Sequence, residues 1–459
     1  MNIDNINKVY FIGIGGIGMS SLARYFKSIG KEVAGYDKTP TSLTTALEEE
    51  GIKIHFTDNV ENISKTFKKN EETLIVFSPA VPKSNNELQF FVKNNFQIKK
   101  RAEVLGLITN NKKSIAVAGT HGKTTTSTLI AHILKCANLE PSAFLGGISQ
   151  NYESNILIGN NPDGYVVVEA DEYDRSFLNL HPTFAVITSV DADHLDIYGD
   201  LNYLYESYSL FANQVSSTLT INNSVVGKIN QPNNSCVYGT FNGTSNYFAQ
   251  NITVSEAEYH YEVVTPSKTI KNLTLGLPGD HNVENSIAAI AIAEQLNIPE
   301  EIIRTSLKSF TGVKRRFEYQ IKTDRLVYID DYAHHPSELK ACINSIKKMY
   351  PNKKITGIFQ PHLFTRTRDF ANEFANSLDL LDECFLMDIY PARELPIEGV
   401  NATMLLNKMK LERKKHCKFN TVLDEINSDD IDVLLTLGAG DIDTLVQPIK
   451  DKLLNGIKN

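Results

Sequence analysis

The strongest constraint on the fold of this 459-residue chain is a pair of glycine-containing loops, each placed between a short apolar run and a helical pattern. The first loop is Gly13-Ile-Gly-Gly-Ile-Gly18, and the second is Gly119-Thr-His-Gly-Lys-Thr-Thr125. A buried strand, a glycine turn and a helix in this order start a βαβ unit, which belongs to a parallel sheet covered by helices. The sequence therefore predicts an α/β protein with more than one parallel sheet.

The alternation of strand and helix patterns starts afresh twice, at Lys113 and after Lys314-Arg-Arg316. At roughly 150 residues per domain, the length also favours about three domains. We predict a Rossmann-like domain over 1–110, a central P-loop ATPase-type domain with a mostly parallel sheet over 111–315, and a Rossmann-like domain over 316–459. The stretch Ser216–Lys271 is rich in Asn, Ser and Thr, and we expect β-structure there without being able to place its strands.

The pattern places elements at the following positions. Strands are expected at Lys8–Gly13, Glu32–Tyr36, Lys53–Phe56, Thr73–Phe77, Ser114–Ala118, Tyr165–Val168, Phe184–Val190, Leu326–Ile329, Ile355–Phe359, Cys384–Met387 and Val433–Leu437. The clearest helices are expected up to Ile29, at Thr124–Cys136, at Asp280–Leu296 and at about Asp443–Leu454.

Composition excludes several classes of protein. The formal net charge is −8, whereas a general nucleic-acid binder is basic, so we expect no nucleic-acid partner. The 5 cysteines are scattered without a C-x-x-C pair, which excludes a disulfide framework and a zinc ribbon. The apolar N-terminal stretch contains the glycine loop and Arg24, so it predicts neither a signal peptide nor a membrane span. We expect a cytoplasmic protein that does not insert into membranes.

The first loop matches G-x-G-x-x-G, and Asp37 lies at the end of the next strand. Glycines let a backbone approach a diphosphate at a helix N-terminus, and the acidic residue suits a ribose. This pattern is typical of NAD binding, but it indicates a diphosphate and not what is attached to it. A nucleotide-sugar diphosphate is therefore an open alternative, and so is a tight turn without a ligand.

The second loop resembles a P-loop, in which backbone N–H groups, Lys123 and the hydroxyl of Thr124 would hold phosphates and Mg²⁺. It is shorter than G-x-x-x-x-G-K-[ST], because Val117 stands where that pattern has glycine. A buried salt bridge of Lys123 is the structural alternative to phosphate binding.

Acidic residues and a histidine follow the two strands expected beside this loop. Strand alternation would send Glu169 and Asp171 to one face and Glu172 to the other, and His194 follows the next strand. If the sheet is parallel, these strand ends converge on the phosphate loop. Helix capping or a solvated turn is the alternative role, and it is the better interpretation for Asp191 and Asp196.

Two further polar clusters follow successive strands in the last third of the chain. They are Asp330-Asp-Tyr-Ala-His-His-Pro336 and Gln360-Pro-His-Leu-Phe-Thr-Arg-Thr-Arg368. Histidines and arginines here could grip a carboxylate or neutralise a phosphoryl group. Each single histidine has helix capping as an alternative, but ligand sites in open α/β sheets gather at these strand ends.

Taken together, these motifs resemble the Mur ligase family along the whole chain. The residues that carry the resemblance are the two loops (the first extended to Ser20), Glu169-Ala-Asp-Glu172, Asp193-His194, His281-Asn282, Arg315-Arg-Phe-Glu318, Asp331 to Pro336, Phe359-Gln-Pro-His362 with Arg366-Thr-Arg368, and Leu437-Gly-Ala-Gly-Asp441. His121 in the second loop resembles the branch that adds L-alanine to UDP-N-acetylmuramate and the recycling branch that attaches a peptide. The Gln360 to Arg368 segment resembles the alanine-adding branch.

The resemblance implies an ATP- and Mg²⁺-dependent ligase whose substrates are UDP-N-acetylmuramate and L-alanine, with roles for individual residues. It implies UDP-sugar binding by Gly15, Gly16, Gly18, Met19, Asp37 and Ser78, and ATP binding by Gly119, Thr120, His121, Gly122, Lys123, Thr124, Thr125, Asn282 and Tyr332. The implied Mg²⁺ ligands are Thr124, Glu169 and His194. The implied catalytic residues are Lys123, His194, His334 and Arg366.

The chain departs from the family pattern at Leu363, where members often have arginine. Several sister ligases carry a carbamylated lysine after the metal histidine, but no lysine occurs here between His194 and Lys228. The resemblance associates that absence with the alanine-adding branch. The peptide-attaching branch and, outside the family, an NAD-dependent oxidoreductase stay as alternatives, as does a nucleotide-driven switch without ligation.

Overall fold

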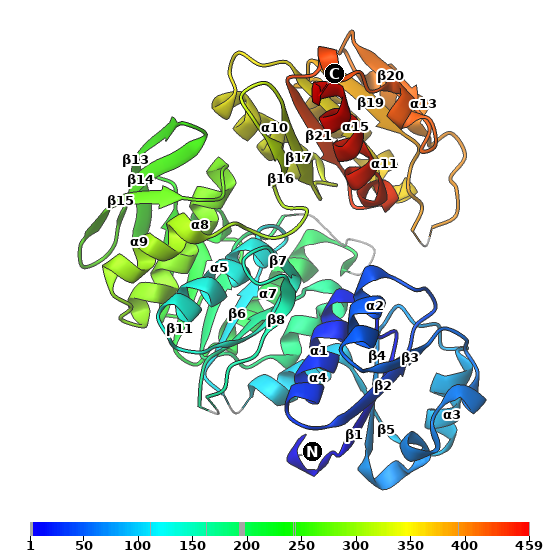
Figure 1. Ribbon diagram of the computed structural model, residues 1–459. Helices are drawn as coiled ribbons and strands as arrows, with labels where there is room; N and C mark the ends of the chain where they lie inside the picture. The colour runs from blue at the N-terminus through cyan, green and yellow to red at the C-terminus, as the bar shows by residue number, and fades with distance from the viewer. Residues whose placement is uncertain are drawn as a thin grey trace. The chain divides into compact units, whose positions relative to one another are not determined.

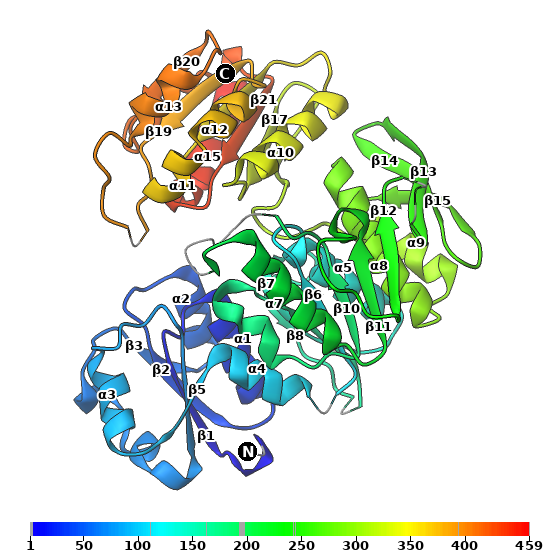
Figure 2. The same ribbon diagram turned by 180° about the vertical axis from the view of Figure 1, so that it is seen from behind.

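The computed structural model describes residues 3–110, 112–161, 163–191, 198–241, 243, 245–392 and 394–458. Within these residues the chain forms three sheets flanked by helices (Figures 1 and 2). The prediction of an α/β protein with three domains and mostly parallel sheets is confirmed. None of the described helices is both long and apolar enough to serve as a membrane span.

The N-terminal sheet has the order β3-β2-β1-β4-β5, and each pair of neighbouring strands in it is parallel. Its strands are β1 (Lys8–Ile12), β2 (Glu32–Tyr36), β3 (Lys53–His55), β4 (Thr73–Phe77) and β5 (Gln97–Lys100). Its helices are α1 (Ile17–Ser28), α2 (Ser42–Glu49), α3 (Asn86–Lys93) and α4 (Arg101–Thr109). The first glycine loop lies at the carboxyl end of β1 in the centre of this sheet, where a Rossmann-like fold binds its ligand.

The middle sheet has the order β15-β14-β13-β12-β11-β10-β6-β9-β7-β8. Its strands are β6 (Ser114–Ala118), β7 (Ser142–Ser149), β8 (Ser154–Leu157), β9 (Val166–Glu169), β10 (Phe184–Ile187), β11 (Thr218–Asn222), β12 (Ser235–Gly239), β13 (Tyr247–Ser255), β14 (Glu258–Val264) and β15 (Thr269–Leu275). Its helices include α5 (Lys123–Cys136), α7 (Leu201–Asn213), α8 (Asp280–Gln295) and α9 (Glu300–Ser309). Strand β6 is buried along its whole length and pairs in parallel with β9 and β10, so both neighbours end beside the second loop, as predicted.

The C-terminal sheet has the order β16-β17-β21-β18-β19-β20 and is parallel except for the edge strand β16. Its strands are β16 (Glu318–Lys322), β17 (Val327–Asp331), β18 (Ile355–Phe359), β19 (Glu383–Met387), β20 (Lys414–Cys417) and β21 (Val433–Leu437). Its helices are α10 (Pro336–Met349), α11 (Phe364–Asp369), α12 (Ala371–Leu378), α13 (Ala402–Lys408), α14 (Val422–Glu425) and α15 (Val446–Lys458).

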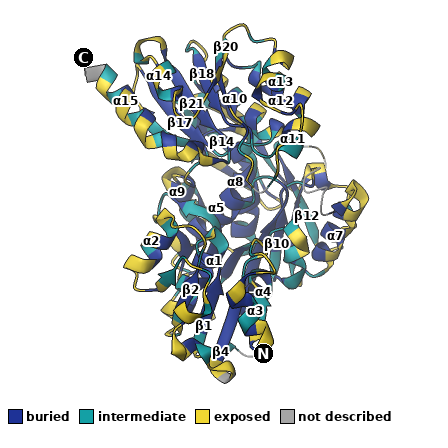
Figure 3. Cartoon of the chain, turned by 90° about the vertical axis from the view of Figure 1, so that its right-hand side faces the viewer, coloured by how far each residue is buried: buried dark blue, intermediate teal, exposed yellow. Residues whose placement is uncertain are grey.

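The described residues form two compact units. The first contains the N-terminal sheet and most of the middle sheet, and one apolar core runs through both, from Phe11 on β1 to Ala116 on β6. The second contains the C-terminal sheet together with 251–261 and 274–283. Colouring by burial shows the strands as the buried layer and the outer helix faces as the exposed layer (Figure 3).

Three predicted boundaries are wrong in an instructive way. Strand β10 ends at Ile187 and not at Val190, because Thr188 and Ser189 turn toward the second loop with their hydroxyl groups. The C-terminal helix begins at Val446 and not near Asp443, since the preceding turn is a tighter 3-10 helix, Asp441–Leu445. Strand β9 spans Val166–Glu169 and not Tyr165–Val168. Asp171 and Glu172 lie beyond its end, so the strand alternation assumed for them does not apply.

Candidate active site

The second loop opens directly between β6 and α5, in a backbone conformation that depends on glycine. Gly119 and Gly122 have φ values of 134° and 80°, which L side chains rarely adopt. A Cβ on Gly119 would lie 2.0 Å from the Thr188 hydroxyl oxygen, and one on Gly122 would lie 2.5 Å from Oδ1 of Asn285. Gly122 is also the N-cap of α5 and has no side chain with which to cap it, so the first turn is arranged as anion-binding loops are.

Lys123 starts α5 and forms an ion pair with Glu172. Its Nζ donates to Oε1 of Glu172 at 2.9 Å and to the carbonyl oxygen of Gly119 at 2.5 Å. Burial acts to lower the pKa of Lys123, but the neighbouring carboxylates, Glu172 foremost, raise it above its ordinary value. The ammonium group is therefore charged, and Glu172 is its counter-ion here.

This pairing corrects the expectation that strand alternation places Glu172 on the face opposite Glu169 and Asp171. Glu172 lies beyond the end of β9, with helical φ and ψ values of −74° and −20°, so the two-residue period of a strand does not set its direction. The carboxylates of Glu169, Asp171 and Glu172 all lie near enough to Lys123 to act on its pKa.

Glu169 lies at the carboxyl end of β9, against the backbone of β7. A Cβ on Gly146 would lie 2.1 Å from Oε2 of Glu169, so the glycine makes room for the carboxylate. That Oε2 is buried and has no hydrogen-bond partner among the described residues. A buried carboxylate oxygen in this state is suited to a cation.

The other predicted metal ligands are only partly described. Thr124 is buried in the first turn of α5. His194, together with Asp193, lies outside the described residues, so its prediction as a metal ligand and catalytic residue stays untested. Within the described part of the chain, no group of three or more His, Cys, Asp or Glu residues has the arrangement of a metal site.

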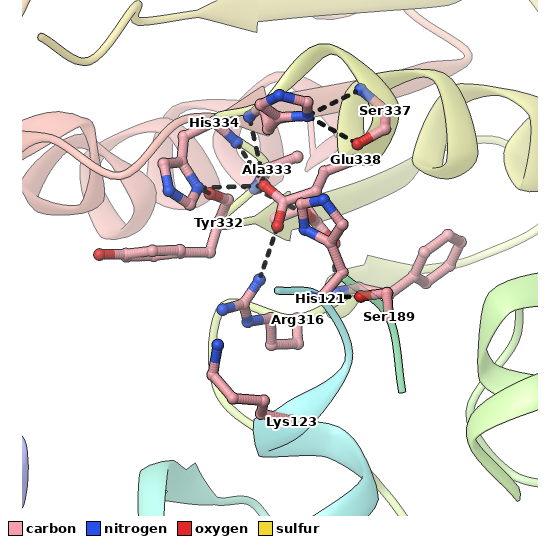
Figure 4. Close-up of polar contacts among 12 residues, drawn as sticks. His121, Lys123, Ser189, Arg316, Tyr332, Ala333, His334, Ser337 and Glu338 are labelled. Atoms are coloured by element: carbon pink, nitrogen blue, oxygen red, sulfur yellow. Dashed lines mark hydrogen bonds and ion pairs between the residues drawn. The ribbon is translucent and has the colours of Figure 1, made fainter. Parts of the chain in front are cut away.

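Hydroxyl groups from the end of β10 support the second loop, and the sequence pattern did not indicate them. The backbone N–H of His121 donates to Oγ of Ser189 at 2.9 Å (Figure 4). The hydroxyls of Thr120 and Ser189 lie 2.8 Å apart. Nε2 of His121 lies 3.7 Å from Oδ2 of Asp191, which is half exposed. No motif links these positions in the sequence, because the contact arises from the pairing of β6 with β10.

The first loop is held by Asp37. Oδ2 of Asp37 accepts a hydrogen bond from the backbone N–H of Gly15 at 2.7 Å, and Oδ1 accepts one from Thr39 at 3.1 Å. Gly16 is the N-cap of α1. Asp37 therefore lies at the loop, as predicted. Its carboxylate contacts the loop backbone, whereas the sequence pattern suited it to a ribose.

The remaining residues assigned to this loop have different surroundings. Ser78 follows β4, and its Cβ lies 3.2 Å from the place that a Cβ on Gly13 would take, so it borders the loop. Met19 is 2% exposed and its side chain packs in the core, with Cγ 3.8 Å from the place that a Cβ on Gly16 would take. Gly18 lies against the side chain of Arg101, a contact that the sequence pattern did not indicate.

In the second unit, aromatic rings from three strand ends meet. The ring centroids of Tyr332 and His334 lie 5.2 Å apart, those of His334 and His362 6.0 Å apart, and those of His362 and Tyr390 5.7 Å apart. The guanidinium groups of both Arg315 and Arg316 lie over the Tyr332 ring, at 5.1 and 4.9 Å. The two predicted clusters thus meet beyond the carboxyl ends of β17 and β18, although β21 lies between these two strands in the sheet.

A carboxylate in the first turn of α10 organises this cluster. Oε2 of Glu338 accepts hydrogen bonds from the backbone N–H groups of His334 and His335, at 3.0 and 3.2 Å, and Oε1 lies 4.0 Å from Arg316 (Figure 4). His335 is the N-cap of the helix, with Pro336 in its first turn. The capping alternative thus holds for His335, while the His334 ring lies among the other rings.

Three further residues of the predicted motifs lie in the second unit. Burial raises the pKa of Asp331 to about 6, and its carboxylate accepts hydrogen bonds from the backbone of Phe317 and Ala333. Asn282 is 3% exposed, and its side-chain amide donates to the carbonyl oxygen of Pro278 at 2.7 Å. Arg366 lies on α11, which follows the Gln360-Pro-His362 segment.

Comparisons with known proteins agree along the chain. Family models match residues 8–113 (Mur ligase family, catalytic domain), 117–293 (Mur ligase middle domain) and 315–440 (Mur ligase, glutamate ligase domain). A UDP-N-acetylmuramate–L-alanine ligase from Flavobacterium johnsoniae is 50% identical over 455 residues, which cover 99% of each chain.

Solved structures show the same likeness. A UDP-N-acetylmuramate–alanine ligase from Thermotoga maritima superposes with a TM-score of 0.82 at 29% identity, covering 98% of this chain and 99% of that one. A murein peptide ligase from Psychrobacter arcticus gives a TM-score of 0.71 at 21% identity, covering 98% of this chain and 99% of that one, and shares the fold.

Proposed function

The chain belongs to the Mur ligase family, and from this premise we propose that it is an ATP-dependent ligase that joins L-alanine to UDP-N-acetylmuramate. The products are ADP, phosphate and the amide, which is a precursor of peptidoglycan. The observation that carries the proposal is the 50% identity, over 99% of both chains, to a UDP-N-acetylmuramate–L-alanine ligase. The site described above supplies the groups that such a reaction needs.

The proposed reaction needs ATP because the carboxylate has to be activated before it can react with an amine. A carboxylate does not condense with an amine at neutral pH, because oxide is a very poor leaving group. Transfer of the γ-phosphoryl group of ATP to the muramoyl carboxylate gives an acyl phosphate, whose leaving group is inorganic phosphate. The amine of L-alanine then attacks the acyl carbon, and the tetrahedral intermediate collapses to the amide.

The main barrier to the first step is electrostatic, since an anionic carboxylate has to approach an anionic triphosphate. Two unit charges about 4 Å apart repel each other by about 4 kcal/mol at an effective dielectric constant of 20. Lys123, together with the backbone N–H groups of the loop Gly119–Thr125, counters this repulsion at the transferring phosphoryl group. The charged state of Lys123 and its position at the start of α5 support this role.

A magnesium ion fits the residues beside this loop. The buried Oε2 of Glu169, which lacks a hydrogen-bond partner among the described residues, and the Thr124 hydroxyl are oxygen ligands of the kind that Mg²⁺ prefers. We assign the ion to Thr124, Glu169 and His194. When bound, the ion would neutralise charge on the phosphate oxygens.

The remaining roles follow the division of the chain. The UDP-sugar binds the domain that ends near residue 110, at Gly15, Gly16, Gly18, Met19, Asp37 and Ser78. Thr120, His121, Gly122 and Thr125 complete the phosphate loop of the central domain, and Asn282 and Tyr332 contact the adenine side of ATP. In the domain that begins near residue 316, His334 and Arg366 lie at the incoming amino acid or the muramoyl carboxylate. We propose that the ligation takes place in the cytoplasm.

The activity is tested by phosphate release from ATP, measured with each substrate alone and with both together. Release that requires both UDP-N-acetylmuramate and L-alanine supports the ligase. Release with a peptide in place of L-alanine identifies the peptide-attaching branch. An absorbance change of a nicotinamide cofactor without phosphate release identifies the oxidoreductase, and either of these results contradicts the proposal.

A further inference from the structure

Arg101, the first residue of α4, occupies the space beside the third glycine of the first loop. A Cβ on Gly18 would lie 2.5 Å from Nη1, 3.0 Å from Cδ and 3.2 Å from Cζ of Arg101. Gly18 is in the first turn of α1, and Cα–Cβ bonds in a helix tilt toward its N-terminus. The guanidinium group therefore lies toward the N-terminal end of α1, in the space that a side chain at residue 18 would fill.

A cation is electrostatically unfavourable at this place unless an anion accompanies it. The N-terminus of a helix carries a partial positive charge, so anions are favoured there and cations disfavoured. The carboxylate that accompanies Arg101 is Asp171, whose Oδ2 accepts from Nη2 at 3.1 Å. Asp171 comes from the end of β9, in the acidic segment that also contains Glu172, the partner of Lys123.

The pair of Arg101 and Asp171 is of a kind that an anionic ligand can replace. Its side chains are 24% and 38% exposed, and such partly exposed pairs contribute little to stability. Guanidinium groups bind phosphate through two parallel hydrogen bonds, which are stronger than ordinary ones. A diphosphate at the first loop would thus outcompete Asp171 for Arg101.

We propose that Arg101 is a diphosphate-binding residue of the UDP-sugar site, contributed by α4, and that Asp171 holds its guanidinium group until the ligand binds. This inference rests on the proposed function, because it concerns the same UDP-sugar. Arg101 would supply a positively charged side chain to the first loop, whose glycines have no side chains. It also explains why residue 18 is glycine, since a larger residue would displace the guanidinium group.

A matched pair of variants separates ligand binding from a structural role at the contact between α4 and the segment after β9. Lys100 makes the neighbouring ion pair, with Asp174 at 2.7 Å, between the same parts of the chain. Arg101→Ala removes the proposed contact, and Lys100→Ala removes only its neighbour. Arg101→Lys retains the positive charge without the bidentate geometry, and it serves if Arg101→Ala does not fold.

The measurement is the affinity for UDP by isothermal titration calorimetry, with ADP as the probe of the second loop. We expect Arg101→Ala to weaken UDP binding by about tenfold or more, as for the loss of a hydrogen bond to a charged group, and Arg101→Lys to weaken it less. Lys100→Ala should bind UDP as the wild type does, and ADP affinity should not change in any of the three. In turnover, Arg101→Ala should raise KM for the UDP-sugar and leave kcat nearly unchanged.

Asp171→Asn supplies a second test, because it removes the competing charge and keeps an acceptor for the Tyr173 N–H. It should tighten UDP binding when Arg101 is present and have no effect in the Arg101→Ala background. Wild-type protein that binds UDP while Arg101→Ala binds it equally well would overturn this inference and leave the proposed function standing. Wild-type protein that does not bind UDP would overturn both.

Discussion

A buried polar cluster in the N-terminal sheet leads to a prediction about stability and pH. Glu87 on α3 is fully buried, and its Oε2 accepts a hydrogen bond from the Tyr10 hydroxyl at 2.7 Å. Nε2 of His55 lies 2.8 Å from the same hydroxyl and 3.3 Å from Oε1 of Glu87. Burial raises the pKa of Glu87 from its ordinary value of 4.5 to about 7, and burial lowers the pKa of His55.

The sign of the effect follows from proton binding. Between pH 4.5 and about 7 the folded state holds a proton on Glu87 that the unfolded state has lost, so the free energy of unfolding falls as the pH rises. A change in pKa from 4.5 to about 7, at about 1.36 kcal/mol per pH unit, corresponds to about 3 kcal/mol. Above pH 7 this penalty is complete, and below pH 4.5 it is absent.

Glu87→Gln removes the titration and keeps the shape of the protonated side chain. The variant should match the wild type near pH 5 and be more stable by about 2 to 3 kcal/mol at pH 8. The assay is urea denaturation followed by far-ultraviolet circular dichroism across this range, since the chain contains no tryptophan. A stability difference that is the same at pH 5 and pH 8 would refute the reasoning.

Three other variants test the site. Lys123→Ala should abolish substrate-dependent phosphate release while calorimetry shows UDP binding mostly intact, and equal loss of both would contradict the separation of the two loops. Gly146→Ala places a Cβ 2.1 Å from Oε2 of Glu169, so it should raise the Mg²⁺ concentration that gives half-maximal activity. The affinity for UDP should not change. An unchanged Mg²⁺ dependence would argue against Glu169 as a ligand. Gln360→Ala removes the hydrogen bonds of its side chain with Asp441 and the Ile442 N–H, and denaturation should show a loss of about 1 to 3 kcal/mol in the free energy of unfolding; no loss would contradict a stabilising role of these two bonds.

The sequence predicted those parts of the fold that depend on local pattern. Strands β2, β4, β6, β18 and β21 have the predicted bounds, because each is a short apolar or β-branched run between turn residues. The hairpin β7–β8 was missed, since the glycines and serines of Ser142–Ser149 do not give a strand pattern. Strand β16 was missed because it is a half-exposed edge strand without a continuous apolar run.

The site was predictable where a loop carries its own chemistry and not where distant segments meet. The Gly119–Thr125 loop can be recognised from its own sequence, because a phosphate loop needs its glycines and Lys123 close together in the chain. Ser189 and Arg101 have no local signal, since their contacts depend on strand pairing and on the packing of α4 beside α1. Glu172 was misplaced because strand alternation was extended to it, although β9 ends at Glu169.

The central claim is that the muramoyl carboxylate is activated by phosphorylation before L-alanine attacks. Isotope tracing tests it directly, with ¹⁸O in the lactyl carboxylate of UDP-N-acetylmuramate and mass analysis of the released orthophosphate. If the carboxylate is phosphorylated first, one ¹⁸O atom from it appears in each phosphate formed. Orthophosphate without ¹⁸O, in a reaction that still yields the amide, would contradict it.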